Sequence, residues 1–467
     1  MEGLIGIKAK KKPIIITAII VVLIVVFGGM AAYQVNHFNQ GIAINGVDVS
    51  GLTAKQAVDK LENTKLNNDV WVDGKVIFHG EATSSGFKAS DVPAVKKLLK
   101  KQFTLIPLHK DKNYNILADN DNQYRKTTVH SAVEQILNKE NQSRKSAKDA
   151  YAELKDGKVT IVKAEDGNRY DVKAMMSEFD KQINNDKIEL KSVEQKPLTA
   201  SSKTVQDEKA KLEKLADASV NYRVENQTYD LKASDCINSA KYINGKYIIN
   251  SEKLKDKIDQ INKEKATLGK KFKFKTTAGK EIEVQGKTYG WALSDKKAQA
   301  TILKAMEDGT KNVDAKQDIY GIGYNENGTG YGVTSNDGIG DTYAELSLAD
   351  QHAWFYRDGK LVDQVDVVTG DVKTNSETPK GVYYIMYQQS PSILRGTHPD
   401  GKKYACKVQY WSQFTDDGCG FHDASWRTNW ANNAYLTDGS NGCANIRPAQ
   451  AEAVYKALSV NEPVIVY

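Results

Sequence analysis

A long apolar segment near the N-terminus constrains this chain more than any other feature. Residues 14–33 carry no charged side chain and are rich in Ile and Val. At about 1.5 Å per residue, a helix of roughly 20 residues matches a hydrocarbon core of about 30 Å. The segment has no polar face for solvent, which argues against a core helix of a soluble domain. It therefore predicts a transmembrane helix.

The flanking charges predict how this helix is oriented. Four lysines lie between residues 8 and 12, and no Lys or Arg follows the apolar run before Lys55. The positive-inside rule makes residues 1–13 a cytoplasmic tail and places everything after residue 33 outside the cell. The alternative is a cleaved signal peptide. The apolar run is longer than the roughly 7 to 15 residues usual there, and Met30-Ala31-Ala32 is a poor cleavage site, so we favour a retained single-pass anchor.

Composition limits the remaining possibilities. A chain of 467 residues predicts about three domains, and its 40% hydrophobic and 27% charged residues allow ordinary folded cores. The net charge of +6 is too small for a polybasic nucleic-acid binder, so we expect no nucleic-acid partner. Four cysteines in so long a chain exclude a scaffold built on disulfides.

The segment between the anchor and the last 127 residues reads as two α+β modules. A short alternating strand, an Asn45-Gly46 turn and a helix capped by Thr53 open the first module. A polar turn, a Tyr and an amphipathic helix occur at 165–183 and again at 286–306. Ser294 is the expected start of the second of these helices and Gly309 its stop. The predicted organisation is a first module at 41–198, a connecting helix at 199–216, a second module at 217–316 and a linker at 317–340.

Residues 341–467 form the third region, which we expect to be mainly β. Alternating segments flank a hairpin turn at Asp358-Gly359, and only Pro448–Leu458 reads as a helix. The predicted fold class is therefore a multidomain chain with an N-terminal transmembrane helix, two α+β modules and a mainly-β C-terminal domain.

One constellation in this region carries chemistry. His422 precedes Cys443 by 21 positions, and Cys443 lies within Ser440-Asn441-Gly442-Cys443. An imidazole can take the proton of a thiol, and the thiolate is the nucleophile. Gly442 permits close approach of backbone amides to an oxyanion, and Ser440 and Asn441 can orient the turn or the imidazole. The alternative is a buried structural Cys and an unrelated His.

With these residues the region resembles the catalytic domain of L,D-transpeptidases, enzymes that cross-link peptidoglycan. The family signature of His, then Ser/Thr-His-Gly-Cys and Asn, is matched by His422, Ser440, Gly442, Cys443 and Asn445. The two modules resemble the peptidoglycan-binding repeats of some Gram-positive wall enzymes, through residues 44–53 and Tyr289-Gly290-Trp291. This chain departs from the signature at Asn441, where the family usually has His. Asn cannot hold a proton at neutral pH.

The resemblance implies a function. Cys443 would be acylated by the third residue of a donor tetrapeptide stem with release of D-Ala, His422 acting as general base and acid. An acceptor amine would then form a 3-3 cross-link outside the membrane, without metal or cofactor, and carbapenems would acylate the same Cys. Water as acceptor would make the protein an L,D-carboxypeptidase. A non-catalytic wall-binding scaffold and a cysteine protease are the other hypotheses.

Substrate contacts and the other cysteines are less constrained. Trp426, Arg427, Asn445 and Tyr410 are candidate substrate-binding residues, although Trp426 and Arg427 can equally be structural. The resemblance implies that 387–410 forms a hairpin flap over the cleft. The sequence leaves open a disulfide between Cys406 and Cys419, or a regulatory pairing of Cys419 with Cys443. It also leaves open whether the two modules bind glycan or serve only as spacers.

Overall fold

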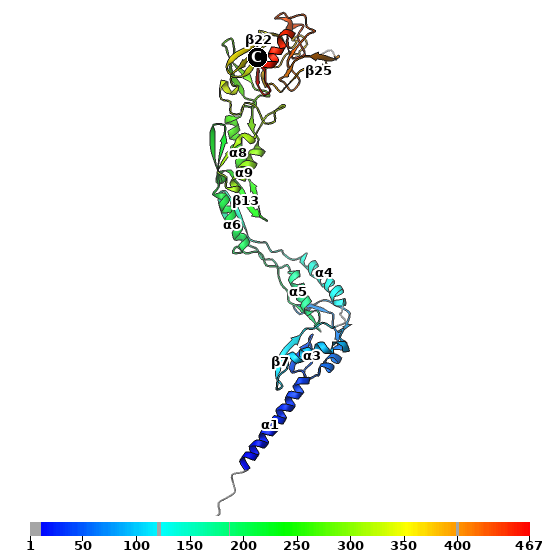
Figure 1. Cartoon of the computed structure of the whole chain (residues 1–467). Coiled ribbons are helices and arrows are strands. Elements are labelled where there is room, and N and C mark those ends of the chain that lie inside the picture. The colour runs from blue at the N-terminus through cyan, green and yellow to red at the C-terminus, as the bar shows by residue number, and fades with distance from the viewer. Residues whose placement is uncertain (1–10, 119–122, 186, 398–400) are drawn as a thin grey trace, which may run out of the picture. The chain divides into compact units, whose positions relative to one another are not determined.

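The structure, a computed structural model, describes residues 11–118, 123–185, 187–397 and 401–467 (Figure 1). Residues 1–10 of the expected cytoplasmic tail lie outside the described part. The chain divides into two compact units, one ending at Ala200 and the other containing Ser201–Tyr467. Residues 151–162 belong to the second unit. The segment predicted as the first module therefore contributes to both units.

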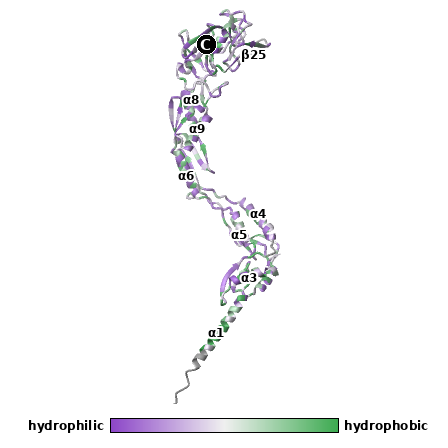
Figure 2. Ribbon diagram, viewed as in Figure 1, coloured by the Kyte–Doolittle hydropathy of each residue, from purple (hydrophilic) through white to green (hydrophobic). Residues whose placement is uncertain are grey.

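The N-terminal apolar segment is helical. Helix α1 runs from Lys11 to Asn36, and within it Ile16–Asn36 is long and apolar enough to cross a membrane by length and composition. Figure 2 shows the hydrophobic colouring of this helix. Its large apolar side chains, such as Ile24 and Val25 at 65% and 66% exposure, are not covered by the rest of the protein. Such surface is costly in water, so α1 is a candidate membrane span.

The first unit has two small cores. The first lies between helices α2 (Ala54–Glu62) and α3 (Val92–Lys101) and a sheet of order β2-β1-β7. The second lies between helices α4 (His130–Asn141) and α5 (Val172–Gln182) and a sheet of order β10-β4-β5. The strands of the unit are β1 (Gln40–Ile44), β2 (Val47–Asp48), β3 (Lys65–Leu66), β4 (Val70–Val72), β5 (Lys75–Phe78), β6 (Thr83–Ser84), β7 (His109–Tyr114) and β10 (Ile188–Leu190). The predicted cap is confirmed, because Thr53 and Gln56 form a capping box at the start of α2.

The N-terminal half of the second unit is an α+β module around one core. Its helices are α6 (Lys203–Ala216), α7 (Ala233–Cys236), α8 (Glu252–Lys265) and α9 (Asp295–Asp308). Its strands are β8 (Tyr151–Lys155), β9 (Lys158–Val162), β11 (Ser219–Val224), β12 (Gln227–Lys232), β13 (Ser239–Ile243), β14 (Lys246–Asn250), β15 (Lys271–Lys275), β16 (Glu281–Gln285), β17 (Ala292–Leu293), β18 (Asn312–Asp314) and β19 (Ile319–Tyr320). The connecting helix α6 is part of this module, since its Leu212 and Leu215 are buried in the core. Ser294 and the left-handed Gly309 cap α9 as predicted.

The segment predicted as a linker packs against this module. Thr329 accepts a hydrogen bond from the Gly290 N–H, and the Tyr331 ring lies edge-on to Trp291 at 4.8 Å between centroids. A Cβ on Gly328 would lie 2.8 Å from the Trp291 side chain, so this close approach requires glycine. Residues 317–340 are therefore held along the module by specific contacts.

The C-terminal domain is a mainly-β fold, as predicted. Its nine-stranded sheet has the order β23-β30-β20-β21-β22-β29-β28-β27-β24, and α10 (Pro448–Ala457) packs on β22 and β28. The strands are β20 (Tyr343–Ser347), β21 (His352–Arg357), β22 (Lys360–Val368), β23 (Gly381–Tyr384), β24 (Tyr387–Gln389), β27 (Trp411–Gln413), β28 (Gly420–Asp423), β29 (Ala444–Ile446) and β30 (Pro463–Val466). A separate hairpin consists of β25 (Ser392–Thr397) and β26 (Lys403–Val408). We call β25–β26 the flap.

A further core lies between the module and the C-terminal domain. Phe272 and Phe274 of β15 are buried together with Val382, Tyr384 and Ile465 of the nine-stranded sheet. Beside this core, the fully buried carboxylate of Glu345 accepts hydrogen bonds from the Thr277 N–H at 3.0 Å and the Thr277 hydroxyl at 2.7 Å. It also accepts one from the Tyr467 hydroxyl at 2.6 Å. A buried carboxylate is tolerated because these donors replace its hydration.

The Glu345 contacts predict a measurable contribution to stability. Glu345→Ala leaves the Thr277 and Tyr467 donors without their acceptor, which we expect to lower the free energy of unfolding by about 3 kcal/mol. Urea denaturation of the full-length protein in detergent measures this change. The matched control is Glu281→Ala, at an exposed position of β16. Equal stability of the two variants would show that Glu345 does not hold the junction.

Candidate active site

Parallel pairing of β28 and β29 builds the candidate site. In this register His422 lies opposite Asn445, and Cys443 stands at the residue before β29. Because paired residues on parallel strands project to the same face, the His and Asn side chains meet. The Asn445 amide lies 3.0 Å from His422 Nε2.

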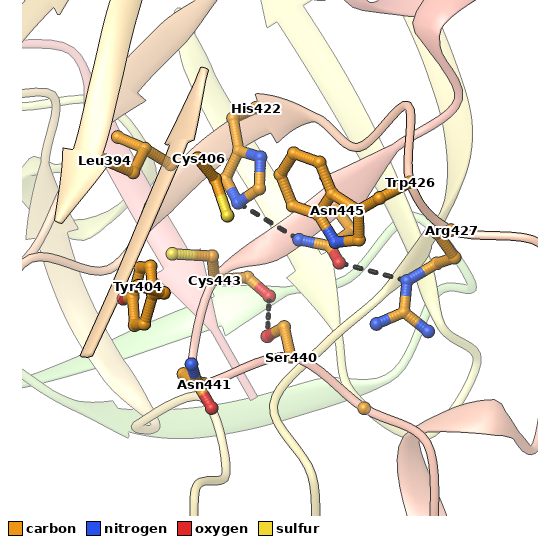
Figure 3. A pocket seen from close by; sticks show the side chains of 11 residues that line it. Leu394, Tyr404, Cys406, His422, Trp426, Arg427, Ser440, Asn441, Cys443 and Asn445 are labelled. Atoms are coloured by element: carbon orange, nitrogen blue, oxygen red, sulfur yellow. Dashed lines mark hydrogen bonds between the residues drawn. The ribbon is translucent and has the colours of Figure 1, made fainter. Parts of the chain in front are cut away.

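These side chains line one cavity of about 160 Å³ (Figure 3). Of the residues predicted from the sequence, it contains His422, Trp426, Arg427, Ser440, Asn441, Cys443 and Asn445. Tyr410 is not among its lining residues; its ring packs against Tyr455, and its N–H donates to the Asp423 carboxylate.

The flap supplies three lining residues that sequence reasoning missed. Leu394, Tyr404 and Cys406 face the cavity, and in Figure 3 the Cys406 sulfur points toward Cys443. Leu394 pairs directly with Cys406 across the hairpin, and Tyr404 pairs with Gly396. Alternation along 403–408 was the available signal, because it places residues 404 and 406 on one face. Without the pairing, the sequence could not show that this face turns toward Cys443.

All four cysteines are free thiols. The bridge between Cys406 and Cys419 that the sequence left open is absent here, because Cys406 faces the cavity from the flap whereas Cys419 is buried beneath Gly442. Gly442 has a φ of +111°, and a Cβ at this position would lie 2.7 Å from the Cys419 sulfur. Both the backbone conformation and the close packing therefore require glycine before Cys443.

Two hydroxyl groups hold the turn before Cys443. Ser440 Oγ donates to the Cys443 carbonyl at 2.5 Å and accepts from the Gly442 N–H at 3.1 Å. Thr378 Oγ1 donates to the Gly442 carbonyl at 2.7 Å. Ser440 is thus engaged with the backbone of the turn. The Gly442 amide would have to leave Ser440 before it could stabilise an oxyanion.

The hydrogen bonds of His422 define its tautomer. Nδ1 lies 2.8 Å from the Asp423 carbonyl oxygen, which can only accept, so Nδ1 carries the proton. Nε2 then has the free electron pair, and it accepts from the Asn445 amide. The ring has two indoles as neighbours, with centroids 5.7 Å from Trp411 and 5.8 Å from Trp426. Burial in this setting lowers the pKa of His422.

The Cys443 thiol is also neutral. Its sulfur lies 3.7 Å from the Gly418 carbonyl oxygen. The pKa of Cys443 is raised to about 12, mainly by burial and also by the neighbouring Cys419, against the lowering effect of a hydrogen bond from the Gly420 backbone. Among the described residues, the thiol and the imidazole therefore share a cavity as two neutral groups without a hydrogen bond between them. Such a pair can act by general-base catalysis, with proton transfer during attack.

Sequence comparisons place this domain among known proteins. Residues 341–466 match the family described as L,D-transpeptidase catalytic domain (YkuD). Residues 199–315 match a family described as "Putative peptidoglycan binding domain", and thus include α6. A search of curated proteins found no match.

The solved structures that are similar to this chain include L,D-transpeptidases. The catalytic domain of the Enterococcus faecium L,D-transpeptidase acylated by ertapenem is 35% identical, covering 27% of this chain and 97% of that chain, with a TM-score of 0.25. The chain belongs to the L,D-transpeptidase family. A Cys-to-Ser mutant of the Enterococcus faecium L,D-transpeptidase is 27% identical over 55% of this chain and 98% of that chain, with a TM-score of 0.43. L,D-transpeptidase 3 of Mycobacterium tuberculosis is 22% identical over 27% of this chain and 61% of that chain, with a TM-score of 0.24.

The raised pKa of Cys443 predicts how its thiol reacts with iodoacetamide. Because alkylation requires thiolate, the rate at Cys443 should rise with pH through the whole range from about 7 to 10, beyond the pKa of about 8.5 of a free thiol. Peptide mass spectrometry resolves Cys443 from the other cysteines, and free cysteine serves as the reference. A rate that is already constant near pH 7 would instead indicate a preformed thiolate.

Proposed function

We propose that this chain is a membrane-anchored L,D-transpeptidase that forms 3-3 peptidoglycan cross-links through a thioester on Cys443. The observation that carries the proposal is that Cys443, His422 and Asn445 line one cavity of a domain belonging to this family. The apolar helix α1 supports anchoring, and the peptidoglycan-binding family match at 199–315 supports action at the cell wall.

The proposed reaction exchanges one acyl bond for another. Once the Asn445 amide N–H has left the electron pair of His422 Nε2, this nitrogen takes the thiol proton as Cys443 attacks the carbonyl of the third stem residue. The amide C–N bond breaks, the imidazolium gives its proton to the leaving amine of D-Ala, and a thioester remains. An acceptor amine then attacks this thioester while His422 takes a proton from the amine. The C–S bond breaks, and His422 passes that proton to the departing sulfur. No net oxidation occurs, and the energy of the broken amide bond is carried through the thioester.

Two other activities are compatible with this site. Water in place of the acceptor amine makes the product a shortened stem, which is L,D-carboxypeptidase activity. Loss of the base function would leave a wall-binding scaffold, the hypothesis raised by Asn441. The cavity favours an active enzyme, because His422 retains an unprotonated nitrogen and Cys443 a free thiol.

Product analysis tests the proposal. Full-length protein in detergent, incubated with disaccharide-tetrapeptide, should release D-Ala and form 3-3 linked dimers that mass spectrometry detects. Cys443→Ala and His422→Asn should each lower the rate on the order of 10³-fold, because nucleophile and base act as one unit. Cys236→Ala removes a buried thiol of the module and serves as the control. Tripeptide monomers alone would identify a carboxypeptidase, and undiminished dimer formation by Cys443→Ala would refute catalysis by this thiol.

Inhibitor binding gives a second readout of the same site. A carbapenem such as ertapenem should add its mass to the peptide containing Cys443. His422→Asn should slow this adduct formation, because the proton of the neutral thiol then has no acceptor.

Asn441 has its own expected effect. Its side chain hydrogen-bonds the Tyr404 hydroxyl on the flap, which lowers the otherwise burial-raised pKa of that Tyr. We expect Asn441→Ala to reduce kcat/KM about 5-fold through loss of one hydrogen bond of about 1 kcal/mol, and Tyr404→Phe to give a similar reduction. The double variant should be no worse than either single variant. A loss on the order of 10³-fold for Asn441→Ala alone would give Asn441 a direct role in the chemistry.

A further inference from the structure

Arg427 is buried beside the two side chains that meet in the site. It follows β28 in the sequence, and only 7% of its side chain is exposed. Its Nε donates to Asn445 Oδ1 at 3.0 Å, and its Nη1 donates to the Asp438 main-chain oxygen. The Asp438 carboxylate lies 3.8 Å from the same Nη1. These contacts fix the plane of the guanidinium and direct its Nε–H at the Asn445 amide (Figure 3).

This contact decides which way the Asn445 amide faces. Arg427 can only donate, so the amide oxygen must be on its side. The amide nitrogen is then on the side of His422, 3.0 Å from Nε2. Because that nitrogen is itself a donor, Nε2 must accept. The same result follows independently from the bond between Nδ1 and the Asp423 carbonyl.

Protonation of His422 conflicts with this arrangement. An imidazolium carries a hydrogen on Nε2, which would point at the N–H of Asn445. The amide could accept that hydrogen only after a half-turn that places its nitrogen against the Arg427 Nε–H. The N–H groups of Asn445 and Arg427 would then face each other, with no acceptor between them. One such unmatched contact in a buried site costs about 1 to 3 kcal/mol.

We propose that Arg427 is a positioning residue that, through Asn445, holds His422 as a neutral imidazole with Nε2 as its basic atom. This interpretation differs from the substrate-binding role that the sequence suggested for Arg427 and Asn445. The catalytic consequence rests on the proposed function. A protonated His422 formed during attack is unstable in this setting, so it returns its proton readily to the leaving amine.

The other ionisable groups near His422 also bear on its pKa. Burial is the main cause of the lowered pKa of His422, and the Arg427 charge lowers it further, against the backbone bond and charge of Asp423. The Asp423 carboxylate accepts from the backbone N–H groups of Gln409 and Tyr410. The other titratable groups that line the cavity are Tyr404 and Cys406 on the flap and Cys443.

The test measures the protonation of His422 itself. The full-length protein with ¹⁵N-labelled histidine is followed by NMR from pH 5 to 9, and His422→Asn identifies the His422 signals. In the wild type we expect the Nδ1–H tautomer to persist to the acidic end. Arg427→Met should raise the pKa of His422 by about one unit or more, because the amide is free to turn and a cation is lost. The acid limb of carbapenem acylation should move upward with it.

Three further variants separate the mechanism from simpler explanations. Arg427→Lys keeps the charge but lacks the planar Nε–H, so it should also raise the pKa. Asn445→Asp should raise it most, because a carboxylate accepts from Nε2–H. Arg447→Met removes a charge that stacks on Trp430 outside the cavity lining, so it should leave the pKa unchanged.

Defined results would overturn the proposal. An unchanged pKa of His422 in Arg427→Met, with or without a lower melting temperature, would make Arg427 purely structural. A wild-type pKa in Arg427→Lys would show that charge alone acts and that the Asn445 route is wrong. If Arg427→Met does not fold, Arg427→Lys and Asn445→Asp still decide. The NMR readout needs no turnover, so an inactive wild type would refute the proposed function without affecting this result.

Discussion

The parallel pairing of β28 with β29 is the constraint on which the site depends. Both strands lie in the interior of the C-terminal sheet, and their register sets His422 opposite Asn445. The turn that enters β29 carries Cys443 to the same cavity, held by the hydroxyls of Ser440 and Thr378. A shift of one residue in this register would turn the side chains of β29 to the opposite face and separate the pair.

Around this pairing, burial gives the site its electrostatic character. The His422 imidazole is buried beside the Trp411 and Trp426 indoles, and Cys443 lies in the cavity wall next to Gly442, which packs on Cys419. Desolvation penalises charge, which lowers the pKa of the His and raises that of the Cys. The His422 imidazole and the Cys443 thiol are therefore both neutral at rest, rather than an imidazolium–thiolate ion pair. The hydrogen bonds of Asp423, Asn445 and Arg427 then select one tautomer of the imidazole.

The sequence predicted local structure well where a residue acts on its near neighbours in the chain, as a helix cap does. Thr53 and Ser294 begin helices, Gly309 ends one, and the apolar stripe of α9 is buried, all as expected. It predicted less where the partner is distant in the chain. Residues 151–162 belong to the second unit, although the residues on either side of them in the sequence belong to the first. Residues 317–340, predicted as a linker, pack on Trp291 and Tyr289. Strand pairing and aromatic contacts of this kind depend on long-range register, which composition does not encode.

By itself, the sequence determined the chemical groups of the site: a Cys and a His at the spacing of a known family, an Asn in place of a second His, and an apolar segment long enough to cross a membrane. Tertiary structure alone decided which of these groups contact one another and in which direction their hydrogen bonds run. It directed the Arg427 Nε–H at Asn445, brought Tyr404 and Cys406 of the flap to the cavity that contains Cys443, and placed Tyr410 outside the lining. The physical reason is that proton position and pKa follow from hydrogen-bond direction and burial, and both arise only when distant strands pair.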